Sequence, residues 1–191
     1  LLPINSALIA PQMKNTDSPS RKLIGIAEII PESATGSYDV REVIEQIVDE
    51  GILTELKKDW ATNIVTSLAT INGHTVGIIA NQPQFLAGTL DIAASQKGAR
   101  FVTFCDAFNL PLITFVDTPG FQPGKDLEWR GMIRHGAQLA FAYANATVPR
   151  ICVTLRKSYG GAYIVMDSKK MGNDLAIAGP SAEIAVMGAK G

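Results

Sequence analysis

The chain has 191 residues, of which 47% are hydrophobic and 18% are charged, a composition suited to one globular domain with its own core. Its 17 basic and 18 acidic side chains leave a net charge of −1, which gives no electrostatic reason to expect nucleic acid or an anionic membrane as a partner. No apolar run approaches the roughly 20 residues that a membrane-spanning helix needs.

The N-terminal part of the chain is expected to contain two loops and one short helix. Residues 10–22 are polar and contain prolines, which is typical of a linker, and residues 31–38 form a second loop. Asp39 is expected to cap a helix with one apolar face, with Glu42 completing a capping box and Gly51 ending the helix.

A hairpin, a long helix and a buried strand are predicted next. The β-rich residues 63–70 and 75–80 flank Asn72-Gly73, a pair that favours the tight turn of a β-hairpin. The spacing of apolar residues predicts a helix over 90–108. The strand 112–116 then leads into a loop rich in proline and glycine.

The C-terminal part again alternates strands with helices. We expect a helix over about 128–145, a buried strand at 151–155, a glycine loop at 159–162, a helix beginning near Gly161, and short strands near 174–178 and 182–187. Buried strands that alternate with helices indicate an α/β domain with parallel strands.

Few side chains are suited to acid–base or nucleophilic catalysis. His74 lies in the predicted hairpin turn and is expected to be solvated, while His135 lies mid-helix, where a structural role is at least as common as a catalytic one. Cys105 and Cys152 have apolar neighbours in the sequence and are interpreted as buried structural thiols in a reducing compartment. Since no zinc-type spacing, carboxylate pair or serine elbow is recognisable, we expect no metal site.

Two glycine-containing loops at strand ends offer backbone N–H groups instead. In residues 158–163 the glycines permit a sharp turn into a helix, whose first N–H groups and dipole suit a developing negative charge. Such an oxyanion hole lowers a barrier without a titrating group. Residues 117–124 form the second loop. Taken alone, both patterns are more often tight turns than functional sites.

Short motifs follow one another in a fixed order from residue 38 onward. They lie at residues 38–41, 81–83, 86–88, 99–102, 105–109, 116–121 (Val-Asp-Thr-Pro-Gly-Phe), 133–137 (Ile-Arg-His-Gly-Ala), 146–149, 156–163 (Arg-Lys-Ser-Tyr-Gly-Gly-Ala-Tyr) and 185–191. Each motif alone is unspecific, but in this order they make the chain resemble the C-terminal domain of the carboxyltransferase (beta) subunit of biotin-dependent acyl-CoA carboxylases, the propionyl-CoA and acetyl-CoA carboxylase family.

This resemblance implies a crotonase-like (ClpP/crotonase) α/β fold of repeated β-β-α units. Residues 1–36 would be an interdomain linker and the end of a preceding domain, and residues 37–191 the C-terminal carboxyltransferase domain. The sequence lacks an initiator Met and stops after a strand-like run, so we expect a fragment that is truncated at its C-terminus.

The resemblance also implies an activity, the transfer of a carboxyl group from carboxybiotin to the α carbon of acetyl-CoA or propionyl-CoA, which gives malonyl-CoA or methylmalonyl-CoA. Gly161 and Ala162 would be catalytic, donating backbone N–H bonds to the ureido oxygen of biotin. Gly160 and Tyr163 would complete the biotin-binding residues. The biotin itself would be attached to a separate carrier domain.

Two further features concern the surroundings of that site. Pro119, Gly120 and Phe121 would line it. Ile164 would set substrate specificity, since family members that accept acetyl-CoA or a broad acyl range resemble this sequence in having an apolar residue there, although neutral drift remains an alternative.

The implied partners are a biotin carboxylase, a biotin carboxyl carrier subunit, the N-terminal carboxyltransferase domain and further copies of the subunit, from a dimer to a hexamer. The implied location is the cytoplasm, or the mitochondrial matrix in a eukaryote. Three alternatives stay open. The chain could belong to a biotin-dependent acyl-CoA decarboxylase, to a hydratase or isomerase with Asp167 as the nearest carboxylate base, or to a non-catalytic assembly module that uses the apolar helix 128–146.

Overall fold

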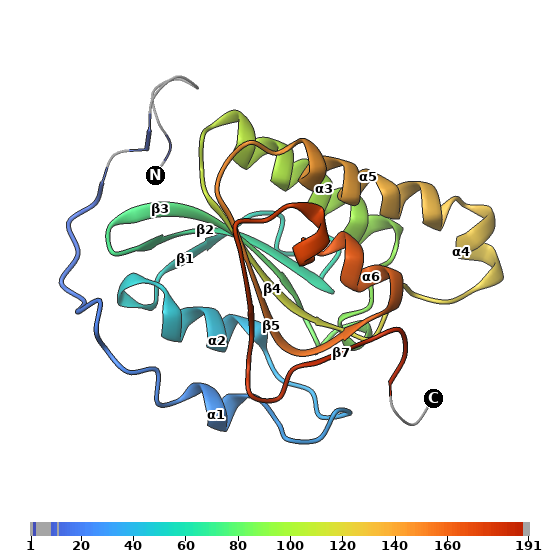
Figure 1. Cartoon of the computed structure of the whole chain (residues 1–191), viewed down its shortest axis with the longest axis horizontal. Helices are drawn as coiled ribbons and strands as arrows, with labels where there is room; N and C mark the ends of the chain where they lie inside the picture. The colour runs from blue at the N-terminus through green and yellow to red at the C-terminus, as the bar shows by residue number, and fades with distance from the viewer. Residues whose placement is uncertain (1, 3–8, 11, 189–191) are drawn as a thin grey trace.

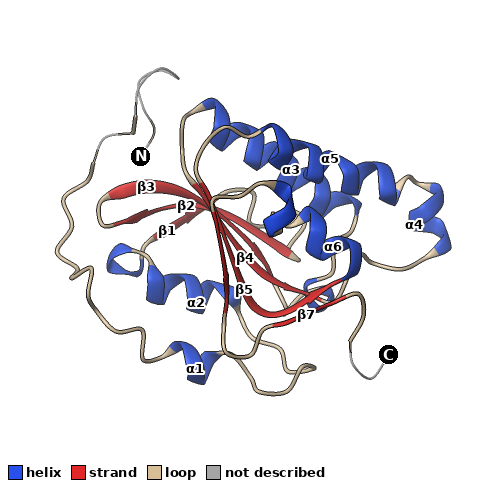
Figure 2. Ribbon diagram, in the orientation of Figure 1, coloured by secondary structure: helices blue, strands red, loops and turns tan. Residues whose placement is uncertain are grey.

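The computed structural model describes residues 2, 9–10 and 12–188, and its elements form one mixed sheet between two layers of helices (Figures 1 and 2). The strands are β1 (Leu53–Glu55), β2 (Ile64–Ile71), β3 (His74–Asn81), β4 (Leu112–Thr118), β5 (Arg150–Tyr159), β6 (Leu175–Ala178) and β7 (Glu183–Ala185). The helices are α1 (Ile26–Ile29), α2 (Val40–Ile47), α3 (Ile92–Ala107), α4 (Lys125–Trp129), α5 (Met132–Asn145) and α6 (Gly160–Val165).

The sheet has the strand order β1-β2-β3-β4-β5-β6, and β7 pairs with the end of β5. Strands β1 to β3 pair antiparallel, whereas β3, β4, β5 and β6 run parallel. The predicted hairpin is confirmed, because Ile71 pairs with His74 around Asn72 and Gly73, which both have positive φ. The carboxylate of Asp49 accepts both turn N–H groups at 2.8 Å, which fixes this end of the sheet.

Two hydrophobic clusters hold the layers together. Helices α3, α5 and α6 cover one face, where Phe101, Leu139 and Val165 pack on strand residues. Helix α2 covers the other face through Val43 and Ile44, and Asp39 caps it as predicted by accepting the N–H of Arg41 at 2.9 Å. The predicted α/β class is therefore confirmed.

Three boundaries differ from the sequence-based expectation. The single helix predicted over about 128–145 is broken into α4 and α5, because Gly131 adopts φ 89° between them. Helix α2 ends at Ile47 and a 3₁₀ turn reaches Gly51. Strand β5 extends beyond the expected residue 155, and this extension brings its last residues beside β7.

The segment before α2 lies along the domain and is held by specific hydrogen bonds. Arg21 Nη2 donates to the carbonyl oxygens of Ile47 and Val48, both at 2.7 Å, and so caps the end of α2. The N–H of Met13 donates to the carbonyl of Gly73 at 2.8 Å. Residues 1, 3–8 and 11 of the predicted linker, and 189–191 of the last motif, lie outside the described residues. The division at residue 36 stays a prediction.

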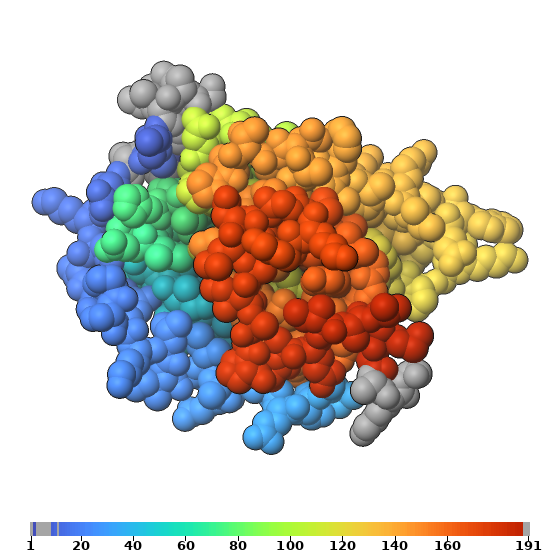
Figure 3. Space-filling model, in the orientation of Figure 1, coloured from blue at the N-terminus to red at the C-terminus, as the bar shows by residue number. Residues whose placement is uncertain are grey.

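Helix α4 projects from the body of the molecule, at the right edge of the space-filling view (Figure 3). Its last residue, Trp129, is 79% exposed. None of the helices in the described ranges combines the length and the hydropathy that crossing a bilayer requires.

Candidate functional site

Helix α6 begins where β5 ends, at the carboxyl edge of the parallel strands. Gly160 makes the turn with φ +61°, a left-handed conformation that favours glycine. Gly161 is exposed and Ala162 is buried, and their N–H groups belong to the first helical turn, which has no partners within the helix. Among the described residues these two groups donate no backbone hydrogen bond outside the helix.

The ring of Phe121 packs against this turn. A Cβ added to Gly161 would lie 3.3 Å from Phe121 Cε2, and one added to Gly136 of α5 would lie 2.8 Å from Cζ. The loop that carries Phe121 is held by a bridge to Leu90, which accepts the N–H of Gln122 at 2.8 Å and donates to the carbonyl of Gly120 at 3.1 Å. The structure therefore brings the two predicted loops, 119–121 and 160–163, into contact.

A buried charged network lies beneath both loops. The Asp117 carboxylate accepts hydrogen bonds from Tyr38 Oη at 2.9 Å, Arg156 Nε at 3.1 Å and the N–H of Lys157 at 3.2 Å. Lys157 Nζ lies 3.8 Å from the same carboxylate. Burial lowers the pKa of Lys157 and raises that of Tyr38. Because Asp117 precedes one loop and Arg156 precedes the other, the network fixes their spacing.

The same cations also anchor the segment before α2. Arg156 donates to the carbonyls of Ser33 at 2.7 Å and Gly36 at 2.8 Å, and Lys157 Nζ donates to the carbonyl of Ala34 at 3.0 Å. This segment, the strand ends and β7 enclose a cavity of about 860 Å³. Sequence reasoning missed this network. The available signal was the charged residues inside otherwise apolar strands.

The remaining candidate side chains are not gathered at this site. His74 is exposed in the hairpin, as predicted. His135 Nδ1 lies 3.2 Å from the Gln96 amide nitrogen on α3. Cys105 and Cys152 are buried free thiols, as predicted, and burial raises the pKa of each to about 12.

The last of these side chains, the candidate base Asp167, is fully buried and forms an ion pair with Arg150. It is therefore not accessible to a substrate in this structure.

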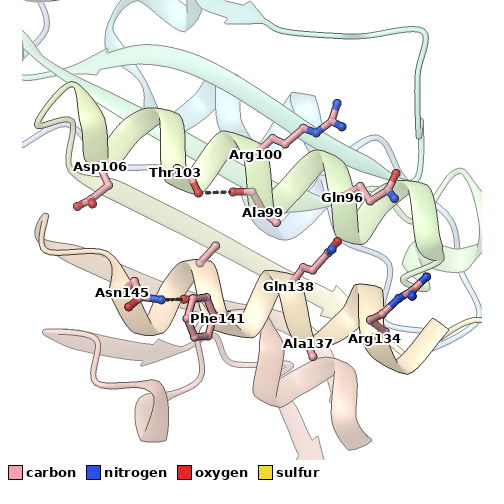
Figure 4. Close-up of a pocket in the computed structure, with 11 residues that line it drawn as sticks. Gln96, Ala99, Arg100, Thr103, Asp106, Arg134, Ala137, Gln138, Phe141 and Asn145 are labelled. Carbon is pink, nitrogen blue, oxygen red and sulfur yellow. Dashed lines mark hydrogen bonds between the residues drawn. The ribbon is translucent and has the colours of Figure 1, made fainter. Parts of the chain in front are cut away.

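A second hollow, of about 840 Å³, lies between α3 and α5 (Figure 4). Gln96 and Arg100 of α3 and Arg134 and Gln138 of α5 line it, together with Phe141, which is 71% exposed. The residues of the 133–137 motif thus contribute to a groove with an exposed aromatic edge, separate from the glycine turn.

Comparison with known proteins gives consistent matches. The family model of the carboxyl transferase domain matches residues 1–191. The carboxyltransferase subunit of propionyl-CoA carboxylase from Haloferax mediterranei is 50% identical over 190 residues, which cover 100% of this chain and 37% of that relative. The alpha subunit of methylmalonyl-CoA decarboxylase from Veillonella parvula is 48% identical, with the same coverage.

A solved structure of transcarboxylase 12S, described as a hexamer assembly with hydrolysed methylmalonyl-coenzyme A bound, superposes with a TM-score of 0.96 at 50% identity. The match covers 100% of this chain and 38% of that one. The superposition confirms the predicted crotonase-like α/β fold.

The fold is that of a carboxyltransferase-type α/β domain, in which the parallel strands of a mixed sheet lead into a short helix that begins at the glycine turn. The chain belongs to the carboxyl transferase domain family, as its resemblance to acyl-CoA carboxylase subunits predicted. It spans 37% of the length of the two relatives described above.

Proposed function

We propose that this chain supplies the biotin-binding half of a site that transfers a carboxyl group from carboxybiotin to the α carbon of a short-chain acyl-CoA. In this transfer the N–carboxyl bond of carboxybiotin would break, the carboxyl group would bond to the α carbon, and the proton of the α carbon would pass to the released biotin nitrogen. The observation that carries the proposal is the glycine turn at the start of α6, whose first-turn N–H groups at Gly161 and Ala162 have no partners within the helix, in a chain of the carboxyl transferase family.

The residues present fit the ureido group of biotin. Gly161 is exposed and has no side chain, so an acceptor oxygen can approach the first turn of α6, while the Phe121 ring fills the side where a Cβ would lie. When bound, carboxybiotin supplies carbon dioxide and leaves negative charge on its ureido oxygen. The N–H groups of Gly161 and Ala162 donate to that oxygen, and the positive end of the helix dipole favours the charge. No titrating side chain is required.

Ile164 is the proposed specificity residue. It is 50% exposed and lies one residue after Tyr163, on the turn that follows the N–H groups. An apolar side chain there offers no polar group to the acyl chain, so it would discriminate between acyl chains by contact area alone. One methylene discriminates by only about 1–3 kcal/mol, so we expect acetyl-CoA and propionyl-CoA both to be accepted.

We also propose that residues 37–191 form the C-terminal domain of a longer subunit, whose N-terminal domain binds the acyl-CoA. A biotin carboxylase with its carrier domain would deliver carboxybiotin. The groove between α3 and α5, with the exposed Phe141 at its edge, would belong to an interface between copies of the subunit. The hexamer described for transcarboxylase 12S supports assembly of this kind.

The test uses the longer subunit that carries this sequence, with free biotin and either malonyl-CoA or methylmalonyl-CoA, and follows formation of the acyl-CoA. Gly161→Pro removes one N–H donor, and Gly161→Ala is the matched control because it adds a Cβ but keeps the N–H. We expect Gly161→Pro to lower kcat by about 10²–10³-fold, as for loss of one oxyanion-hole donor, and Gly161→Ala to lower it much less.

Equal activities of the proline and alanine variants would show that the N–H group is not used. Absence of biotin-dependent turnover in the wild type, with either substrate, would reject the carboxyltransferase function. The ratio of kcat/KM for malonyl-CoA and methylmalonyl-CoA, compared between wild type and Ile164→Asp, tests the specificity assignment.

A further inference from the structure

A buried ion pair lies behind α6, on the side away from the glycine turn. Arg150, the first residue of β5, pairs through Nη1 with Oδ1 of Asp167, and their side chains are 6% and 0% exposed. Arg150 Nη2 also donates to the carbonyl of Met171 at 3.1 Å. Removing two charges from water is costly, and a buried ion pair is weak evidence for stability alone. A role in fixing one particular geometry is the alternative.

The pair fixes the point where the chain leaves α6. Asp167 has φ +56°, a left-handed conformation that is uncommon for a residue other than glycine. Its carbonyl accepts the side-chain amide of Asn173 at 2.6 Å, and the N–H of Arg150 donates to Asp174 at 2.8 Å. These bonds tie the turn after α6 to the start of β5. They do not involve the glycine turn at the other end of α6.

One hydrogen bond connects this anchor to the proposed anion site. The N–H of Met166, the residue before Asp167, donates to the carbonyl of Ala162 at 3.1 Å. Helix α6 has six residues, which span about 9 Å at a rise of about 1.5 Å per residue. A tilt at the Asp167 end therefore moves the N–H groups of Gly161 and Ala162 directly, because fewer than two helical turns separate them.

The two ends of α6 are held by different contacts. The Phe121 ring packs against Gly161 at the first turn. The Arg150–Asp167 pair holds the other end. We infer that Arg150 and Asp167 are positioning residues, which orient the anion-binding N–H groups of α6 without touching the substrate. This inference rests on the proposed function.

The surroundings of Asp167 make the inference testable by pH. Burial raises its pKa to about 6, although Arg150 opposes the shift, and Asp174 adds to it. Tyr143 of α5 and Cys152 of β5 also face it, and burial raises the pKa of both, that of Cys152 to about 12. Of Asp167, Tyr143 and Cys152, Asp167 is therefore the group that changes charge between pH 5 and 8.

The direction of the effect follows from this. Above pH 6 the carboxylate is charged and attracts the Arg150 guanidinium. Below pH 6 it is protonated and the attraction is lost, so α6 is held less firmly and kcat should fall. Asp167→Asn imitates the protonated form, because the amide keeps an acceptor oxygen but carries no charge.

The experiment compares kcat and KM for free biotin, from pH 5.5 to 8, in the longer subunit and its variants, with methylmalonyl-CoA as substrate. We expect Asp167→Asn to lower kcat at pH 7.5 by about tenfold or more with little change in KM, and to remove the part of the pH dependence centred near pH 6. Arg150→Lys, which keeps the charge, should retain more activity than Arg150→Met.

Each outcome supports or overturns the positioning role of Arg150 and Asp167. A folded Asp167→Asn variant with the kcat and pH profile of the wild type would overturn the positioning role while leaving the proposed function intact. A variant that is less stable, but whose folded fraction turns over at the wild-type rate, would do the same. A wild type without biotin-dependent turnover would overturn both the proposed function and the inference. If Arg150→Met does not fold, the comparison of Asp167→Asn with the wild type still decides.

Discussion

Within the charged network described above, substitution of Asp117 should lower the free energy of unfolding most, because its carboxylate is the only anion in that network. It is fully buried and accepts from Tyr38, Arg156 and Lys157. Asp117→Asn keeps the size of the side chain and one acceptor oxygen. It removes the negative charge and turns one acceptor into a donor, which then faces groups that are themselves donors.

The expected loss follows from burial. The side chain of Arg156 is 3% exposed and that of Lys157 is 9% exposed, so in Asp117→Asn two neighbouring cations stay buried without their counter-charge. Breaking a buried pair by removing one partner costs about 3–5 kcal/mol. We expect the free energy of unfolding to fall by that amount, measured by urea denaturation followed by circular dichroism.

A matched control is available on the surface. Asp126 of α4 pairs at 3.5 Å with Arg130, the residue after that helix, and the two side chains are 82% and 63% exposed. Asp126→Asn removes the same charge from the same kind of pair and should cost less than about 0.5 kcal/mol, because water screens it. If Asp117→Asn also lowers the free energy of unfolding by less than about 1 kcal/mol, the Asp117 carboxylate does not compensate the buried charges of Arg156 and Lys157.

Two further predictions test packing and titration. Lys97 Nζ donates to the carbonyls of Trp60 at 2.9 Å and Ile64 at 2.8 Å, and burial lowers its pKa to about 8 from an ordinary value of 10.5. Between pH 8 and 10.5 the unfolded chain therefore binds more protons than the folded chain. The stability of the wild type should rise over this range relative to that of Lys97→Met. Parallel plots of stability against pH for the two proteins would contradict this. Gly136→Ala places a Cβ 2.8 Å from Phe121 Cζ and should cost about 1–3 kcal/mol, part of which Phe121→Leu should restore in a double-mutant cycle; strictly additive losses would contradict the ring contact.

Local sequence signals were sufficient to predict the turns and caps that depend on residues close together in the sequence. The Asn72-Gly73 turn, the Asp39 cap and the turn into α6 each depend on residues adjacent in sequence. The break before α5 also had a local signal, Gly131, but the apolar periodicity on either side concealed it.

The support of the site could not be predicted in the same way. Tyr38 and Asp117 are 79 positions apart in the chain, and Asp117 and Arg156 are 39 apart. No periodicity or motif links such residues, since their contact depends on the sheet order that places β4 beside β5. The motif order indicated that residues 116–121 and 156–163 are motifs of the same protein family. Only the structure shows that the carboxylate of Asp117 joins them.

The orientation of backbone N–H groups depends on the contacts that hold the backbone in place. Here two such contacts lie on one strand. Strand β5 carries Arg150 at its start and Arg156 near its end. Each arginine pairs with a buried carboxylate, Asp167 behind α6 and Asp117 beneath the loops. The two pairs therefore fix both ends of the strand from which α6 departs. Substitution of either carboxylate should alter the orientation of the N–H groups. Because each substitution also leaves a buried arginine without its counter-charge, each should lower stability as well, Asp117 the more because it faces two cations.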